Sequence, residues 1–175
     1  MRQTGNSVSP MSNEGRRAYV VEHLTQALLE LLREKPLDEI SVSQLCERAG
    51  VGRASFYRNF QEKEDILREY IRALFQAWTG QLEQDPPLNE LIRAMFTHFE
   101  THREFYAQLD RRGLIGLLKD VILDACGFRP EQEAAQAYSS AFAAYSLYGW
   151  VEVWFQRGMR ESAEEMAALF RFPSG

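Results

Sequence analysis

The chain has 175 residues, 45% of them hydrophobic, with 20 Lys and Arg, 25 Asp and Glu and a net charge of −5. This length and composition suit two small helical domains with enough apolar side chains for a core. The 2 cysteines, Cys46 and Cys126, lie far apart and share no metal-ligand spacing, which argues against a disulfide framework and against a cysteine-based zinc centre.

The excess of acidic residues belongs to the second half of the chain. Residues 1–80 carry 11 basic and 11 acidic side chains, whereas residues 81–175 carry 9 and 14. A neutral first half predicts modest non-specific affinity for nucleic acid, so DNA binding by this chain would depend on a few well-placed cations.

The chain opens with a polar segment, MRQTGNSVSPMSNEG, that lacks the apolar core of a signal peptide. We expect a flexible arm over residues 1–15 and a cytoplasmic protein. The next segment, RRAYVVEHLTQALLELLREKP, repeats apolar residues at helical spacing and stops at Pro36, which predicts the first helix.

Two short helices joined by a glycine turn are predicted in residues 41–63, SVSQLCERAGVGRASFYRNFQEK. Ser41 and Gln44 form a capping box that starts one helix. Gly50 is placed to stop this helix in a left-handed conformation. In the second helix Phe56 and Phe60 repeat one turn apart, which predicts that they anchor the helix in the core and leave its other side exposed.

The exposed side of the second helix has side chains that suit DNA. Arginine can make two hydrogen bonds to guanine, asparagine can do so to adenine, and small residues allow contact with a thymine methyl group. Tyrosine and lysine suit phosphates, and the start of the following helix adds its dipole to the attraction. The candidates are Arg53, Ala54, Ser55, Tyr57, Arg58, Asn59 and Lys63.

The stretch from about Arg17 to Leu74 resembles the DNA-binding domain of the TetR/AcrR family of bacterial transcriptional regulators. The matching features are the AGVG turn, SFYRNF in the second short helix and KEDIL at the start of the fourth helix. The resemblance implies groove and backbone contacts for the candidates above, with Ser43 and Gln44 on the supporting helix. The family often has Thr or Pro where this chain has Arg53 and Ala54, so the preferred DNA sequence stays open.

The implied organisation is all-α. It consists of a flexible arm (residues 1–15), a three-helix helix-turn-helix DNA-binding domain (16–62) and a C-terminal helical domain for ligand binding and dimerisation (63–175). Apolar periodicity predicts further helices over residues 62–78, 88–109, 113–126 and 130–156, with a break at Asp-Pro-Pro (85–87) and a last helix opened by the capping box of Ser162 and Glu165.

A pair of histidines, His98 and His102, lies one helical turn apart in the helix predicted over residues 88–109. Such a pair can bind a metal, and with Glu100 it leaves a metal hydrolase as one alternative. The order HFETH is not the HExxH of zinc hydrolases, and the chain shows no phosphate loop or dinucleotide motif. We therefore predict no enzyme, no metal and no cofactor.

The helix predicted over residues 130–156 is apolar on two stripes. Its run without charged or amide side chains spans 15 residues between Gln136 and Glu152, short of the ~20 that a membrane span needs. A helix that is apolar on several sides must be buried on several sides, so we expect a second copy of the chain to cover one stripe. In the resembling family the last two helices pair with their copies in a four-helix bundle. The predicted interface residues are Ala137, Ala141, Ala144, Tyr148, Val151, Phe155, Met166, Leu169 and Phe170.

The second stripe is aromatic, and the resembling family commonly holds a small-molecule inducer among such helices. Rings around a cavity would bind an effector, and Glu152 beside them would suit a cationic one. A solid core is the alternative. The predicted pocket residues are Trp78, Phe96, Phe99, Tyr106, Tyr138, Phe142, Tyr145 and Glu152.

The sequence thus predicts a homodimeric transcriptional regulator, a ligand-responsive repressor that binds a palindromic double-stranded DNA operator. A small-molecule effector would act by binding one conformation of the dimer more tightly than the other. In the alternative, the chain still binds DNA, but its C-terminal domain responds to a protein partner. No membrane association is expected.

Overall fold

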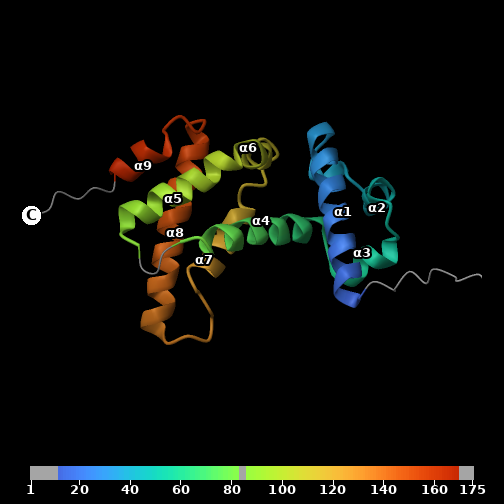
Figure 1. Ribbon diagram of the computed structural model, residues 1–175, viewed down its shortest axis with the longest axis horizontal. Coiled ribbons are helices and arrows are strands. Elements are labelled where there is room, and N and C mark those ends of the chain that lie inside the picture. The colour runs from blue at the N-terminus through green and yellow to red at the C-terminus, as the bar shows by residue number, and fades with distance from the viewer. Residues whose placement is uncertain (1–11, 83–85, 170–175) are drawn as a thin grey trace, which may run out of the picture. The chain divides into compact units, whose positions relative to one another are not determined.

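The computed structural model describes residues 12–82 and 86–169, and every regular element in these ranges is helical (Figure 1). The predicted all-α fold is therefore confirmed. The chain divides into two compact units, one ending at Ile66 and the other beginning at Leu67. Across the described ranges, no helix combines the length and the apolar character that a membrane crossing requires. Residues 1–11, most of the predicted arm, lie outside the described ranges, as do Asp85 and Phe170.

The first unit packs three helices around an aliphatic core. Helix α1 (Asn13–Glu34) lies against α2 (Val42–Ala49) and α3 (Arg53–Asn59), with the one-turn 3-10 helix η1 (Leu37–Glu39) after α1. Because apolar residues recur every three or four positions along α1, one side of that helix is buried. The buried side chains of α1 are Leu24, Thr25, Ala27, Leu28, Leu31 and Leu32.

The turn between α2 and α3 forms as its sequence predicts. The Ser41 hydroxyl accepts a hydrogen bond from the Gln44 amide at 3.1 Å, and the Gln44 side chain accepts one from the Ser41 amide at 3.4 Å. Gly50 ends α2 with φ 65° and ψ 28°, where a Cβ is unfavourable, and Val51 N–H bonds to the Cys46 carbonyl at 3.0 Å. These local signals fix the end of α2 and the turn into α3.

The second unit has an aromatic core. It contains the remainder of α4 (Lys63–Thr79), then α5 (Leu88–Thr101), α6 (Arg103–Arg111), α7 (Leu117–Ala125), α8 (Ala134–Gln156) and α9 (Ala163–Leu169). Helix α5 packs on α9, and α7 packs on α8. Edge-to-face and tilted ring pairs join α5, α6 and α8, which gives more directional contact than aliphatic packing alone. The rings are those of Phe96, Phe99, Tyr106, Trp154 and Phe155.

Three predicted helix boundaries were wrong, each for a local reason. Helix α1 starts at Asn13, inside the predicted arm, because the Ser12 hydroxyl caps the Gly15 amide at 3.1 Å. The helix predicted over 88–109 is two helices, since His102 leaves helical geometry with φ −106° and ψ 26°. Helix α7 starts only at Leu117, because Gly113 has φ 70° and a turn follows it.

The long helix starts later than predicted, at Ala134 instead of residue 130. A turn occupies the preceding residues: Gln132 accepts a hydrogen bond from Arg129 N–H at 2.9 Å and donates one to the Gly127 carbonyl, also at 2.9 Å. The last helix, α9, begins with the predicted capping box, in which Glu165 N–H bonds to the Ser162 hydroxyl at 3.2 Å.

The predicted roles of the two apolar stripes of α8 were wrong: the stripe predicted to meet a partner is turned inward, and the stripe predicted to line a cavity faces outward. Ala144, Val151 and Phe155, predicted to meet a second copy, are buried inside the second unit, and Ala137, Ala141 and Tyr148 of this stripe are half-buried. Met166 of α9 is likewise buried. The aromatic stripe predicted to line a cavity is exposed instead. The exposed fractions are 78% for Tyr138, 77% for Phe142 and 52% for Tyr145.

Both cysteines are free thiols. Cys46 is buried in α2 and Cys126 is half-buried after α7. Burial raises the pKa of each thiol, so neither is held as the reactive thiolate at neutral pH.

Candidate nucleic-acid interface

Helix α3 has one buried anchor and an exposed polar side. Phe56 is completely buried, and the ring of Tyr57 packs edge-on against it at 5.1 Å while 56% of Tyr57 is exposed. Arg53, Ala54 and Arg58 are exposed as well. Arg53 and Arg58 make no ion pair with any residue of the described ranges. Two arginines and a tyrosine therefore stand on one short helix with their polar groups available to DNA.

Asn59 and Ser55 are less accessible than the sequence predicts. Both are half-buried, and the Asn59 amide donates a hydrogen bond to the Ser55 carbonyl at 2.7 Å. This bond holds the amide back along the helix. Asn59 would have to rearrange before it could pair with adenine in the predicted way.

Lys63 braces the first unit. Its ammonium donates hydrogen bonds to the carbonyls of Leu37 and Ile40, at 2.5 and 2.6 Å. These bonds tie the start of α4 to the loop before α2, and a phosphate would have to compete with two carbonyls already in place. These two hydrogen bonds within the first unit are enough to account for a lysine at position 63, without the predicted phosphate contact.

Ser43 and Gln44, for which the resemblance implies DNA contacts, are exposed on the supporting helix α2. The Gln44 side-chain oxygen accepts hydrogen bonds from the Lys35 ammonium at 2.8 Å and from the capped Ser41 amide. Ser43, one residue earlier, is exposed on the same turn. Gln44 is thus partly committed to the capping box, while Ser43 is the more accessible of the two.

A cleft beside α3 adds residues that the sequence analysis missed. It has a volume of about 800 Å³, lies between the start of α1 and α3, and has no acidic side chain in its lining. Arg16 bonds to the Asn13 side chain at 2.6 Å on one side of this cleft, and Arg58 lines the other. The lining residues are Asn13, Arg16, Arg17, Tyr19, Val20, Ser55, Arg58 and Asn59.

The position of Arg16 and Arg17 gives a sequence signal for this cleft. Cations near a helix N-terminus oppose the helix dipole, so two arginines there serve the helix itself poorly. An anion such as a DNA phosphate in the cleft would meet both arginines and Arg58.

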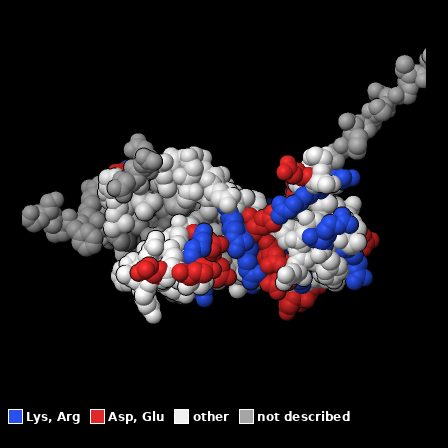
Figure 2. Space-filling model, turned by 90° about the horizontal axis from the view of Figure 1, so that it is seen from below, with Lys and Arg blue, Asp and Glu red and all other residues white. Residues whose placement is uncertain are grey.

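Acidic and basic side chains both cover the first unit, and their pairing decides which cations DNA can use (Figure 2). Arg48 at the end of α2 lies 3.3 Å from Glu30 and 3.4 Å from Glu34 of α1. Its charge is balanced within the unit, although such exposed pairs are individually weak. The unbalanced cations on α3 are Arg53 and Arg58.

The histidine pair of the second unit does not form a metal site with Glu100. His98 is only 5% exposed, and its Nε2 lies 2.8 Å from the Tyr106 hydroxyl. Burial and then the neighbouring His102 lower the pKa of His98 to about 4, so its ring is neutral. Glu100 instead accepts a hydrogen bond from Ala163 N–H at 2.9 Å and so positions α9. In the described ranges, no three His, Cys, Asp or Glu side chains are grouped suitably for a metal.

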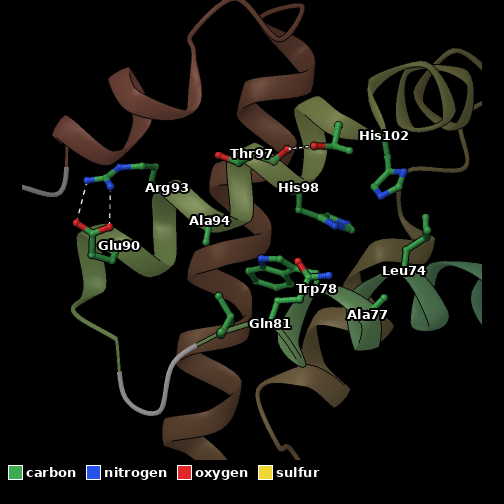
Figure 3. Close-up of a pocket in the computed structure, with 12 residues that line it drawn as sticks. Leu74, Ala77, Trp78, Gln81, Glu90, Arg93, Ala94, Thr97, His98 and His102 are labelled. Atoms are coloured by element: carbon green, nitrogen blue, oxygen red, sulfur yellow. Dashed lines mark hydrogen bonds and ion pairs between the residues drawn. The ribbon is translucent and has the colours of Figure 1, made fainter.

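A second cavity, of about 510 Å³, lies between α4 and α5 (Figure 3). Trp78 is the one predicted pocket residue in its lining. Phe96, Phe99 and Tyr106 are fully buried core side chains, so for these three residues the solid-core alternative applies. Glu152 is half-buried on α8 and accepts a hydrogen bond from the Tyr148 hydroxyl at 3.1 Å. The cavity residues include Leu74, Ala77, Trp78, Gln81, Thr97, His98 and His102.

Comparison with known proteins identifies the family. Residues 24–70 match the family described as "Bacterial regulatory proteins, tetR family", and residues 87–171 match "Transcriptional regulator C-terminal region". One similar solved structure is that of the fatty acid degradation regulator FadR from Bacillus halodurans. It is 14% identical with a TM-score of 0.47, over 92% of this chain and 94% of that one. A search of curated proteins found no match. The chain belongs to the TetR family of bacterial DNA-binding transcriptional regulators, which are not enzymes.

Proposed function

We propose that the protein is a homodimeric, ligand-responsive repressor that binds a palindromic operator and works in the cytoplasm, where such an operator lies. The observation that carries DNA reading is the exposed set of Arg53, Tyr57 and Arg58 above the buried Phe56 on α3. Arginine side chains give base recognition through paired hydrogen bonds, and tyrosine hydroxyls and cations bind phosphates.

We propose a second copy of the chain as the cover for the exposed stripe of α8. Tyr138, Phe142 and Tyr145 place three large rings in solvent, and Val153 continues the stripe with 53% exposure. A side chain added at Gly149 would meet no described atom within 4 Å, so close approach of another helix is open there. Apolar patches of this kind mark interaction surfaces, and a two-fold dimer pairs one such patch with itself.

Helix α9 extends this surface. A groove of about 420 Å³ runs between the end of α8 and α9, and Leu169 on its border is 65% exposed. Of the interface residues predicted from the sequence, Leu169 keeps its place in this proposal. The proposed interface is therefore the aromatic stripe of α8 with Leu169.

A dimer with one α3 in each subunit would reach two half-sites about 34 Å apart, one turn of DNA. An effector that binds better to a conformation with another spacing would lower operator affinity in proportion to its preference. Repression is the simplest outcome of such a coupling, because ligand-free protein would occupy the operator.

Selection of binding sites from random duplex DNA with purified protein tests this function. An enriched inverted repeat supports it, and the winning site then serves in fluorescence anisotropy titrations at two salt concentrations. Arg53→Ala and Tyr57→Ala are expected to weaken binding while the dimer stays intact. Arg48→Ala, whose charge is already paired with Glu30 and Glu34, is the matched control.

Failure to enrich any sequence, with a folded dimer present, would contradict the proposal. A monomer that gains operator affinity when another protein covers the α8 stripe would instead favour the alternative of a protein-responsive regulator. Sedimentation of the purified chain over a range of concentrations shows whether the chain is a dimer or a monomer, and so separates the proposed dimeric regulator from the protein-responsive alternative.

A further inference from the structure

The outer side of α8 carries a row of residues without charge, which we call the α8 seam. Its members recur at alternating intervals of three and four positions, the spacing at which one helix packs along another. Glu152, the charged residue of α8, lies outside this row and bonds to Tyr148. A row without charge can face its own copy, because no like charges meet. The α8 seam consists of Ser139, Phe142, Ser146, Gly149, Val153 and Gln156.

The seam has one large apolar side chain and, further along, a groove that could receive it. Phe142 is 77% exposed. The groove of about 420 Å³ between α8 and α9 begins at Gly149, where an added side chain would meet no described atom within 4 Å. The two charged groups in its lining, Arg157 and Glu161, pair with each other. The remaining lining is apolar and comprises Gly149, Trp150, Val153, Trp154, Met166 and Leu169.

Side-chain size favours an antiparallel pair of seams over a parallel one. In a parallel pair each seam residue would meet its own copy, so that Phe142 met Phe142 in one layer and Gly149 met Gly149 in another. The first layer would be overfilled and the second hollow, and both are unfavourable in a close-packed interface. In the antiparallel pair that overlaps the whole seam, Phe142 faces the partner's Val153, and Gly149 faces the partner's Ser146.

The area that the exposed rings offer is large enough for such a contact. The exposed fractions are 78% for Tyr138, 77% for Phe142 and 52% for Tyr145. At about 150–250 Å² for each ring, the three rings offer roughly 400 Å² in each copy. A stable interface buries about 800 Å² per partner, so these rings supply about half of it before the rest of the seam and Leu169 are added.

We propose that two copies of the chain pair antiparallel along the α8 seam, with the Phe142 ring of each copy seated in the α8–α9 groove of the other. This pairing deepens the dimer of the proposed function and rests on it. It assigns the exposed ring and the groove to each other, so each groove is filled only by the partner copy. Ser146 and Gly149 then lie where the two helices come closest.

Disulfide trapping in the full chain tests the direction and register of the pair. In a background with Cys46→Ala and Cys126→Ala, Phe142→Cys combined with Val153→Cys is expected to give a covalent dimer on mild oxidation, seen on a non-reducing gel. Within one chain these positions lie 11 residues apart on α8. That distance is about 16 Å, well beyond the roughly 7 Å that a disulfide can bridge, so the bond must join two copies.

Phe142→Cys alone, in the same background, is the matched control. In the antiparallel pair the two copies of position 142 lie about 16 Å apart along the helices, whereas in a parallel pair they are neighbours. No covalent dimer is therefore expected from this single variant. Both variants are oxidised at concentrations at which sedimentation shows them to be dimers.

Filling the groove tests the seat of the ring without cysteines. Gly149→Leu is expected to raise the dissociation constant of the dimer at least about tenfold, because the new side chain takes the space of the incoming ring. Gly116→Leu is the control. Gly116 also has helical geometry and no described atom within 4 Å of an added Cβ, but it lies at the start of α7, outside the groove. Circular dichroism checks that both variants keep their helical content.

The opposing results separate this inference from the proposed function. A covalent dimer from Phe142→Cys alone would overturn the antiparallel direction. If the wild type is a dimer, absence of a covalent dimer from the double variant, or unchanged dimerisation of Gly149→Leu, would overturn the seat of Phe142 and leave the proposed dimer standing. A wild type that stays a monomer at every concentration refutes the proposed dimer itself. A trapped dimer that enriches no DNA sequence refutes the proposed operator binding and leaves this pairing intact.

Discussion

Replacing Phe142 by alanine tests the proposed dimer surface most directly. In the protomer 77% of Phe142 is exposed, so the side chain contributes little to the folding of its own chain. Against a second copy, however, the ring would be covered. The substitution is therefore expected to act on dimerisation and to leave the fold of each protomer intact.

The size of the effect follows from the exposed surface. A packed phenylalanine buries about 150–250 Å², so the 77% that is exposed in Phe142 leaves roughly 120 Å² more apolar area to cover than alanine does. At about 25 cal/mol per Å², this area is worth about 3 kcal/mol for each copy if the ring is fully covered. A two-fold dimer contains two copies, and with half of this area covered the dimer loses about 3 kcal/mol, or on the order of 100-fold in its dissociation constant.

Sedimentation velocity over a range of concentrations measures this shift, and circular dichroism checks the helical content. Leu88→Ala is the control, because Leu88 is 49% exposed at the start of α5 and lies outside the α8 stripe. If Phe142→Ala dimerises as tightly as the wild type and Leu88→Ala does not, the second copy covers a different surface and the reasoning fails.

Three other predictions concern single side chains. Arg16→Ala is expected to lower operator affinity and to reduce the slope of log affinity against log salt by about 1, because one phosphate contact is lost; an unchanged slope would remove the α1 cleft from the interface. Lys63→Met leaves two carbonyls without their donor and is expected to lower the free energy of unfolding by about 1–3 kcal/mol in urea titrations; full stability with reduced DNA affinity would instead restore its predicted phosphate role. His98 has a pKa of about 4 in the folded chain, below its ordinary value of 6.5, so its contribution to stability is present above pH 6.5 and is lost as pH falls toward 4. This contribution is up to about 3 kcal/mol, and urea midpoints of His98→Asn at several pH values are expected to fall less with acid than those of the wild type, whereas parallel curves would contradict the assigned pKa.

The pH effect has a second consequence, for the His98–Tyr106 pair. The imidazole of His98 and the hydroxyl of Tyr106 share one hydrogen bond, and burial raises the pKa of Tyr106 above its usual range. Both groups are thus neutral across the physiological range. The His98–Tyr106 pair therefore keeps the same charge state as pH varies around neutrality.

The helix-turn-helix could be read from the sequence because its determinants are local. The Ser41–Gln44 capping box, the left-handed Gly50 and the one-turn spacing of Phe56 and Phe60 each act within a few residues, and each acts in the structure as predicted. Phe56 fixes which side of α3 is inside. The exposure of Arg53, Tyr57 and Arg58 follows from that anchor, and their DNA contacts remain a prediction.

The faces of α8 were not determined by the sequence. Both stripes of this helix are apolar, so amphipathicity gives no preference for one side, and the choice depends on where α5 and α7 meet it. Phe155 packs on Phe99 of α5 at 6.0 Å, which turns its stripe inward and leaves Tyr138, Phe142 and Tyr145 outside. A pattern within one helix cannot show which of two equivalent sides a distant helix will cover.

The same reason applies to single polar groups. By itself the sequence determined an all-α regulator with its reading helix, because caps, turns and apolar periods are properties of neighbouring residues. Only the tertiary structure decided that Lys63 holds Leu37 and Ile40, that Arg16 and Arg58 line one cleft, and that Trp78 lines a cavity with α5. Each of these joins segments that are remote in the chain, and their meeting depends on how whole helices pack.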